Sequence, residues 1–73
     1  MYIELRKNNL RVYINESDIG TIFDERKSNN ECRIKIVTKT GLEFEKVITT
    51  NYELAKWNDF VDGLNMVSLP ITF

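Results

Sequence analysis

Residues 31–48 read ECRIKIVTKTGLEFEKVI, and the apolar and polar residues alternate on both sides of a central Lys-Thr-Gly. Its first part sorts into the two faces of a strand, with Cys32, Ile34 and Ile36 on one face and Arg33, Lys35 and Val37 on the other. Lys39-Thr40-Gly41 has the length of a three-residue hairpin loop, with glycine where such a loop needs a left-handed residue. Pairing through this loop sets Ile36 opposite Phe44. The stretch therefore predicts an antiparallel hairpin with one buried face, in which Cys32 is a small core residue rather than a reactive thiol.

A second hairpin is predicted at the N-terminus. Apolar and polar residues alternate over Tyr2–Lys7 and over Leu10–Ile14, which indicates two strands with one buried face. Asn8-Asn9 separates them, and asparagine tolerates the positive φ that a two-residue turn requires. This turn fixes the register: Ile3 faces Ile14, Glu4 faces Tyr13, Leu5 faces Val12 and Arg6 faces Arg11.

A further strand is expected between the two hairpins, over Thr21–Glu25, with Phe23 facing inward. The preceding residues 15–20 are turn-like and can hold one short helical turn. Because the chain can cross over at this connection, the sequence leaves the strand order open.

A helix is predicted after the strands. Thr50 with Glu53 three residues later forms a capping box, and we expect the helix to end at Gly63. Apolar residues follow the cap at helical spacing, namely Leu54, Trp57, Val61 and Leu64. We expect this helix to lie across the inner face of the sheet, with Trp57 as its largest buried side chain.

The last residues form a short strand pattern that ends the chain. Its apolar members are Val67, Leu69, Ile71 and Phe73, and they alternate with Ser68, Pro70 and Thr72. Pro70 lacks an N–H group, so we expect an edge strand. An apolar strand of this kind needs cover, either from its own sheet or from another chain.

The fold class that follows is α+β. A small antiparallel β-sheet of about five strands, arranged as hairpins, packs against one C-terminal helix, and a final short edge strand completes it. Residues 1–73 form a single domain, because a chain of this length does not divide into two.

Composition excludes several classes of protein. The chain of 73 residues has a formal charge of −1, no His and one Cys. It has no run of about 20 apolar residues for a membrane span and no signal peptide, so a cytoplasmic location is expected. A core of this size provides only marginal stability. The chain can be a marginally stable monomer or can be stabilised by a second copy of itself, and we expect a homodimer.

No catalytic constellation is apparent. Without His there is no Cys/His or Ser/His/Asp set, the glycines are isolated, and zinc and calcium ligands lack the required spacing. We therefore expect a protein that is not an enzyme and that uses no cofactor and no metal.

Two surfaces are candidates for binding a partner. The first is the outer face of the sheet. Alternation along the strands directs one set of basic and aromatic side chains to this face, together with three apolar ones. The basic and aromatic residues are Arg6, Arg11, Tyr13, Arg33 and Lys35, and the apolar residues are Ile22, Val37 and Val47. The second is the edge strand with Val67, Leu69, Ile71 and Phe73. We expect a non-catalytic protein–protein interaction module acting stoichiometrically, of the kind found among phage or mobile-element accessory and inhibitor proteins. The alternative is binding of single-stranded nucleic acid or a phosphate ligand through the basic and aromatic outer face.

Overall fold

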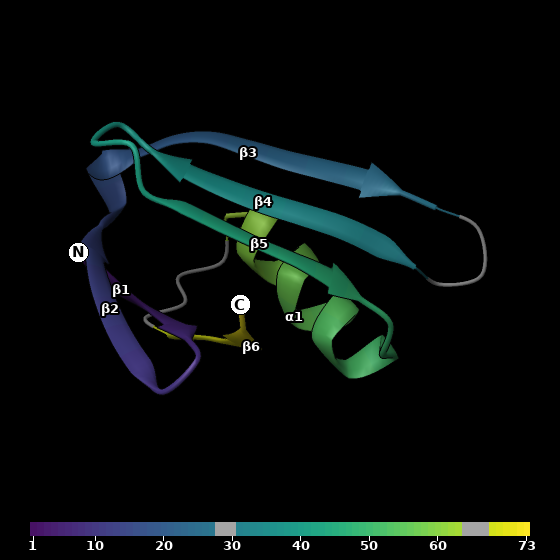
Figure 1. The fold of residues 1–73 in the computed structure, drawn as a ribbon. Helices are drawn as coiled ribbons and strands as arrows, with labels where there is room; N and C mark the ends of the chain where they lie inside the picture. The colour runs from purple at the N-terminus through teal and green to yellow at the C-terminus, as the bar shows by residue number, and fades with distance from the viewer. Residues whose placement is uncertain (28–30, 64–67) are drawn as a thin grey trace.

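The computed structural model describes residues 1–27, 31–63 and 68–73 and confirms the α+β class. The described residues form strands β1 (Tyr2–Lys7), β2 (Leu10–Asn15), β3 (Ile19–Arg26), β4 (Cys32–Thr38), β5 (Glu43–Ile48) and β6 (Ser68–Thr72), a 3₁₀ turn (Glu16–Asp18), and helix α1 (Asn51–Val61). Figure 1 shows β3, β4 and β5 layered over α1 and β6, with β1 and β2 at one end.

The strands are divided between two three-stranded sheets, a division that alternation along the chain did not predict. Their orders are β2-β1-β6 and β3-β4-β5. The turn between β2 and β3 explains the break: Asn15 Oδ1 accepts a hydrogen bond from Ser17 N at 3.1 Å, and Asp18 O accepts one from Lys39 N at 2.7 Å. The chain therefore leaves β2 and enters β3 beside β4.

The N-terminal hairpin has the predicted register. Ile3 lies opposite Ile14, Leu5 opposite Val12 and Arg6 opposite Arg11. Asn8 has a φ of 56°, as expected for the first residue of this turn. One face of the hairpin is thus apolar and turned to the core, and the other carries the arginines.

Strand β6 pairs with β1 in parallel, and it is an edge strand as predicted. The register shifts across Pro70: β1 advances from Glu4 to Arg6 while β6 advances from Ser68 to Thr72. Proline cannot donate to the ladder, so the irregularity falls where a hydrogen bond is missing in any case. The C-terminal strand is therefore covered by its own chain, and Val67 lies outside the described residues.

In the second sheet the β4–β5 hairpin is as predicted, with Ile36 opposite Phe44 and Gly41 at a φ of 94°. The predicted orientation of β3 is wrong. Phe23 lies opposite Lys35 on the outer face and is 52% exposed, whereas Ile22 lies opposite Ile36 on the inner face. A register shift between Ile19 and Thr21 is the cause, because one extra residue in a strand exchanges its two faces.

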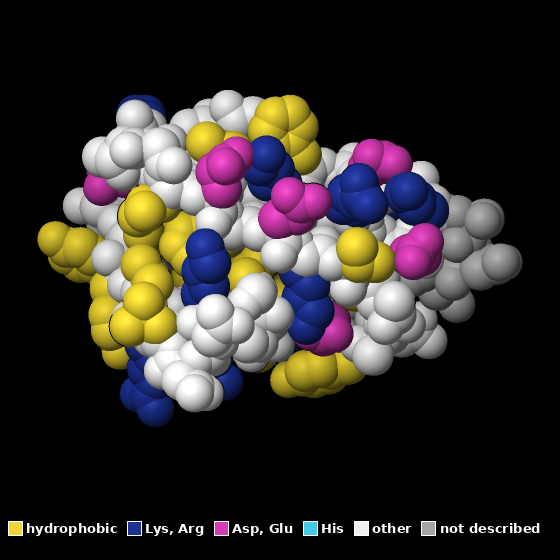
Figure 2. Space-filling view, viewed as in Figure 1, with side chains coloured by type: hydrophobic (Ala, Val, Ile, Leu, Met, Phe, Trp, Pro, Cys, Tyr) yellow, Lys and Arg dark blue, Asp and Glu magenta, His cyan; other side chains and the backbone are white. Residues whose placement is uncertain are grey.

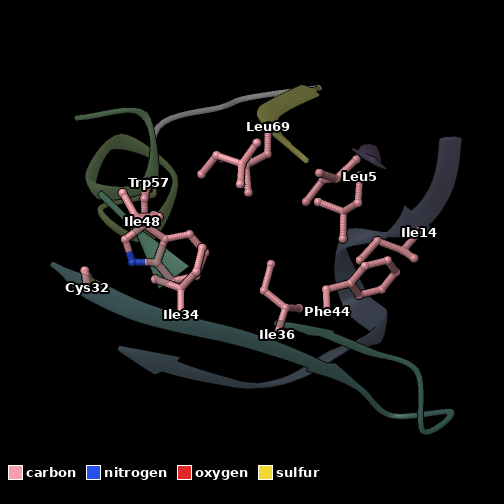
Figure 3. Packing of buried hydrophobic residues seen from close by; sticks show 11 residues of the cluster. Leu5, Ile14, Cys32, Ile34, Ile36, Phe44, Ile48, Trp57 and Leu69 are labelled. Atoms are coloured by element: carbon pink, nitrogen blue, oxygen red, sulfur yellow. The ribbon is translucent and has the colours of Figure 1, made fainter. Parts of the chain in front are cut away.

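One core lies between the sheets and the helix. Thr50 caps α1, since its Oγ1 accepts from Glu53 N at 3.2 Å, and Trp57 is fully buried as predicted. Figure 3 shows side chains of both sheets and of α1 converging. The buried apolar residues are Ile3, Leu5, Ile14, Cys32, Ile34, Ile36, Phe44, Ile48, Trp57, Leu69 and Ile71.

Candidate functional site

The residues predicted to form one outer face lie on two different faces. Arg6, Arg11 and Tyr13 belong to β1 and β2, whereas Arg33 and Lys35 belong to β4 in the other sheet. The expectation that these residues share one outer face is therefore wrong, because β4 pairs with β3 and β5 and not with the N-terminal hairpin. The two sets therefore form separate surfaces.

The apolar side chains Leu69 and Ile71 of β6, and Phe73 after it, pack against the core. Leu69 and Ile71 are fully buried, and the ring of Phe73 packs edge-on against Phe44 with 5.7 Å between centroids. Phe73 N also donates to Arg6 O at 2.8 Å. Leu69 and Ile71 are therefore not accessible to a partner in this fold, whereas Phe73 is only partly buried.

The outer face of the β3-β4-β5 sheet contains a shallow hollow of about 210 Å³. Five side chains from three strands line it: Phe23, Glu25, Arg33, Lys35 and Glu45. Phe23 is the large apolar member, and Lys35 Nζ lies 5.9 Å from its ring centroid, within range of a cation–π contact. Sequence reasoning missed Phe23 as a surface residue because the register shift at Gly20 reverses its direction.

Positive and negative charges are balanced on this face. Lys35 Nζ lies 2.8 Å from Glu43 Oε1, and this hydrogen bond raises the pKa of Lys35 and lowers the pKa of Glu43. Figure 2 shows basic and acidic side chains intermingled over these strands in the upper part of the view. A mixed pattern of this kind complements another mixed protein surface better than a polyanion.

Strand β3 also offers a long free edge. In the part of the chain that the structure describes, β4 is its one neighbour in the sheet, and every residue of the strand after Ile19 is exposed. An unpaired strand edge presents backbone N–H and C=O groups that can add a strand from another chain. Phe23 stands in the middle of this edge, so an apolar anchor and a pairing surface coincide.

The predicted arginine pair occupies a second hollow, at the turn of the N-terminal hairpin. Its volume is about 320 Å³, and its lining residues are Arg6, Asn8, Asn9, Leu10, Arg11 and Thr72. Tyr13 lies on the same face of β2, two residues from Arg11, and is exposed. The sequence register foresaw the opposed arginines, but the contribution of Thr72 depends on the parallel pairing of β6.

A polar junction around Asp24 was not foreseen. Its carboxylate accepts hydrogen bonds from Trp57 Nε1 at 3.0 Å, from Cys32 Sγ at 3.1 Å and from Arg26 Nε at 2.8 Å. One indication of it was present in the sequence: the predicted burial of Trp57 requires an acceptor for the indole N–H. With these donors around it, the carboxylate serves to join β3, β4 and α1.

The junction also makes the thiol unreactive. Burial, together with the hydrogen bond to Asp24, raises the pKa of Cys32 to about 11. The side chain is fully buried, which confirms its predicted place in the core. Thiolate is the reactive form of cysteine, so this residue is poorly suited to nucleophilic chemistry.

Within residues 1–27, 31–63 and 68–73, no three His, Cys, Asp or Glu side chains cluster as metal ligands would. None of the helices in this part of the chain has the length and apolar character to cross a membrane. Comparison of the chain with protein-family models, with curated proteins and with solved structures finds no match.

Proposed function

We propose that this chain is a non-catalytic protein-binding module that acts stoichiometrically, through the free edge of β3 and the outer face of its sheet. The observation that carries the proposal is the position of Phe23, an aromatic residue 52% exposed in the middle of an edge strand whose outer side has no strand neighbour among the described residues. Exposed aromatic residues in such positions are typical anchors of protein interfaces.

The charges around Phe23 support a protein partner. Arg33 and Lys35 share the hollow with Glu25 and Glu45, so the face has no uniform sign. A partner strand added at β3 would gain affinity from backbone hydrogen bonds and selectivity from side chains that meet Phe23. Phage and mobile-element accessory or inhibitor proteins in the cytoplasm act in this stoichiometric way, and we place the chain in that class.

The test compares two exposed aromatic residues on different sheets. The protein, its Phe23→Ser variant and its Tyr13→Ser variant are each immobilised, and proteins retained from lysate of the native host are identified by mass spectrometry. We expect a retained protein that binds the wild type and Tyr13→Ser but not Phe23→Ser. Thermal denaturation of each variant verifies that it is folded.

Salt provides the second criterion. Binding led by phosphate contacts weakens steeply as salt rises, whereas strand addition around an apolar anchor responds little. We expect retention to persist from low to moderate salt. Equal retention by all three proteins, or loss of retention at moderate salt, contradicts the proposal.

A further inference from the structure

Arg6 and Arg11 lie directly opposite each other on β1 and β2, on the face turned away from the core. Side chains opposed in this way have Cβ atoms about 4.5–5.5 Å apart, and like charges in that position destabilise the sheet. Two guanidinium groups so close together favour an anion between them.

One nearby carboxylate, that of Glu4, compensates part of this charge. Arg6 uses Nε for Glu4, at 3.3 Å from Oε1, and its side chain remains 49% exposed. Arg11 takes part in no ion pair among the residues that the structure describes. The terminal nitrogens of Arg6 and the whole guanidinium of Arg11 therefore remain as donors.

The surroundings of the pair form a small polar hollow. Neutral donors line it alongside the arginines, from Asn8, Asn9 and Thr72, and no carboxylate side chain is among its lining residues. The other hollow, under Phe23, contains Glu25 and Glu45. The two hollows thus differ in net charge, although each contains two basic side chains.

The backbone holds this hollow in shape. Phe73 N donates to Arg6 O at 2.8 Å, and Asn8 N donates to Phe73 O at 3.4 Å. These bonds hold the end of β6 beside the hairpin turn. In the resulting register Thr72 lies opposite Arg6. The backbones of the three segments that carry these donors are therefore held next to one another before any ligand arrives, which lowers the entropic cost of binding.

We propose that this hollow binds the dianionic phosphate group of a phosphate monoester. Guanidinium groups bind phosphate oxygens through paired N–H donors, and two of them match a double negative charge. The hydroxyl of Thr72 and the asparagine amides supply neutral hydrogen bonds to the remaining oxygens. The site is separate from the β3 edge, so its ligand and the protein partner bind independently.

The test uses inorganic phosphate and adenosine monophosphate as probes, at an ionic strength held constant with chloride. Binding is followed by NMR shifts of the arginine Nε–H groups and by the melting temperature. The variants are Arg11→Gln and, as a matched control on the other sheet, Arg33→Gln. We expect both probes to shift Arg6 and Arg11 signals in the wild type and in Arg33→Gln, and at least tenfold weaker binding in Arg11→Gln.

Stability without ligand gives an independent readout. Because Arg11→Gln removes a like-charge opposition, we expect its melting temperature in chloride to equal or exceed that of the wild type. Two results would contradict the proposed site. One is an unchanged NMR and melting-temperature response to phosphate in Arg11→Gln, and the other is a response of the wild type to phosphate no larger than its response to chloride. A single-stranded oligonucleotide with internal phosphates only, binding as tightly as adenosine monophosphate, overturns the assignment to a monoester. Phe23→Ser should bind the probes normally, which separates failure here from failure of the proposed function.

Discussion

The indole N–H of Trp57 donates a 3.0 Å hydrogen bond to Oδ2 of Asp24, and this bond joins the buried side chain of helix α1 to an exposed edge strand. Trp57 brings the largest side chain to the core, and its single polar atom needs a partner there. Asp24, on β3, is that partner, and it also accepts hydrogen bonds from Cys32 Sγ and Arg26 Nε. The position of β3, on which the proposed binding edge depends, is thus fixed partly by one carboxylate.

Replacing Asp24 with Ala should lower the free energy of unfolding by about 1–3 kcal/mol, because the indole N–H of Trp57 loses its acceptor. Urea unfolding measures the change. Asp24→Asn retains one acceptor oxygen and should lose less. Glu25→Ala, at a neighbouring exposed position, should stay within about 0.5 kcal/mol of the wild type. A loss in Asp24→Ala no larger than that in Glu25→Ala contradicts the structural role of this carboxylate.

Acid should remove the contribution of the Asp24 carboxylate to the stability of the folded protein. Burial alone raises the pKa of its carboxyl, but hydrogen bonds from Arg26, Cys32 and Trp57 outweigh burial and hold the pKa below its ordinary value of 3.8. A lowered pKa in the folded state means that the carboxylate stabilises the protein above the unfolded value, and that this stability is lost as pH falls through the folded pKa. Urea unfolding at neutral pH and at about pH 3 should show a larger loss in the wild type than in Asp24→Asn. Parallel losses in the two proteins would contradict this assignment.

The thiol of Cys32 should resist modification while the protein is folded. Its side chain is fully buried and its pKa is raised to about 11, so little accessible thiolate exists near neutral pH. We expect a disulfide reagent to react at least about 100-fold more slowly with the native protein than with the protein in concentrated guanidinium chloride. Fast stoichiometric labelling of the native state would show that the junction around Asp24 opens readily.

Both hairpins were predictable because the signals that form them are local. Period-two alternation and the turn residues Asn8 and Gly41 determine the registers, and the pairing of Arg6 with Arg11 follows from them. The helix start was equally predictable, since Thr50 and Glu53 lie within one turn of each other.

The remaining features depend on contacts between distant segments. The shift at Gly20 follows from its approach to β4, where a Cβ atom would lie 3.2 Å from Val37 O, and it turned Phe23 outward. The division into two sheets and the parallel pairing of β6 arise from hydrogen bonds across the chain, such as Phe73 N to Arg6 O. The arginine pair could therefore be found from sequence, whereas the hollow around it and the exposure of Phe23 could not.

A second copy of the chain can use the same edge as the proposed partner. We expect a dimer in sedimentation experiments at about tens of micromolar, because antiparallel pairing of two β3 edges centred on Phe23 would bring the two rings into contact as a cross-strand pair. Phe23→Ser should shift the population to the 8.6 kDa monomer, and Tyr13→Ser should not. A wild type that sediments as a monomer at these concentrations contradicts the homodimer and leaves the β3 edge free for other partners.

The contribution of β6 to the core can be measured with two leucines. Leu69 is fully buried, whereas Leu10, at the hairpin turn, is 62% exposed. Truncating a buried leucine removes its transfer free energy and leaves a cavity, so Leu69→Ala should destabilise the protein by about 2–5 kcal/mol. Leu10→Ala should cost less than about 1 kcal/mol, because most of that side chain is already in water. If the two variants unfold at similar urea concentrations, β6 is not held in the core. Thr72 is then not fixed beside Arg6, and this result would also contradict the proposed phosphate site.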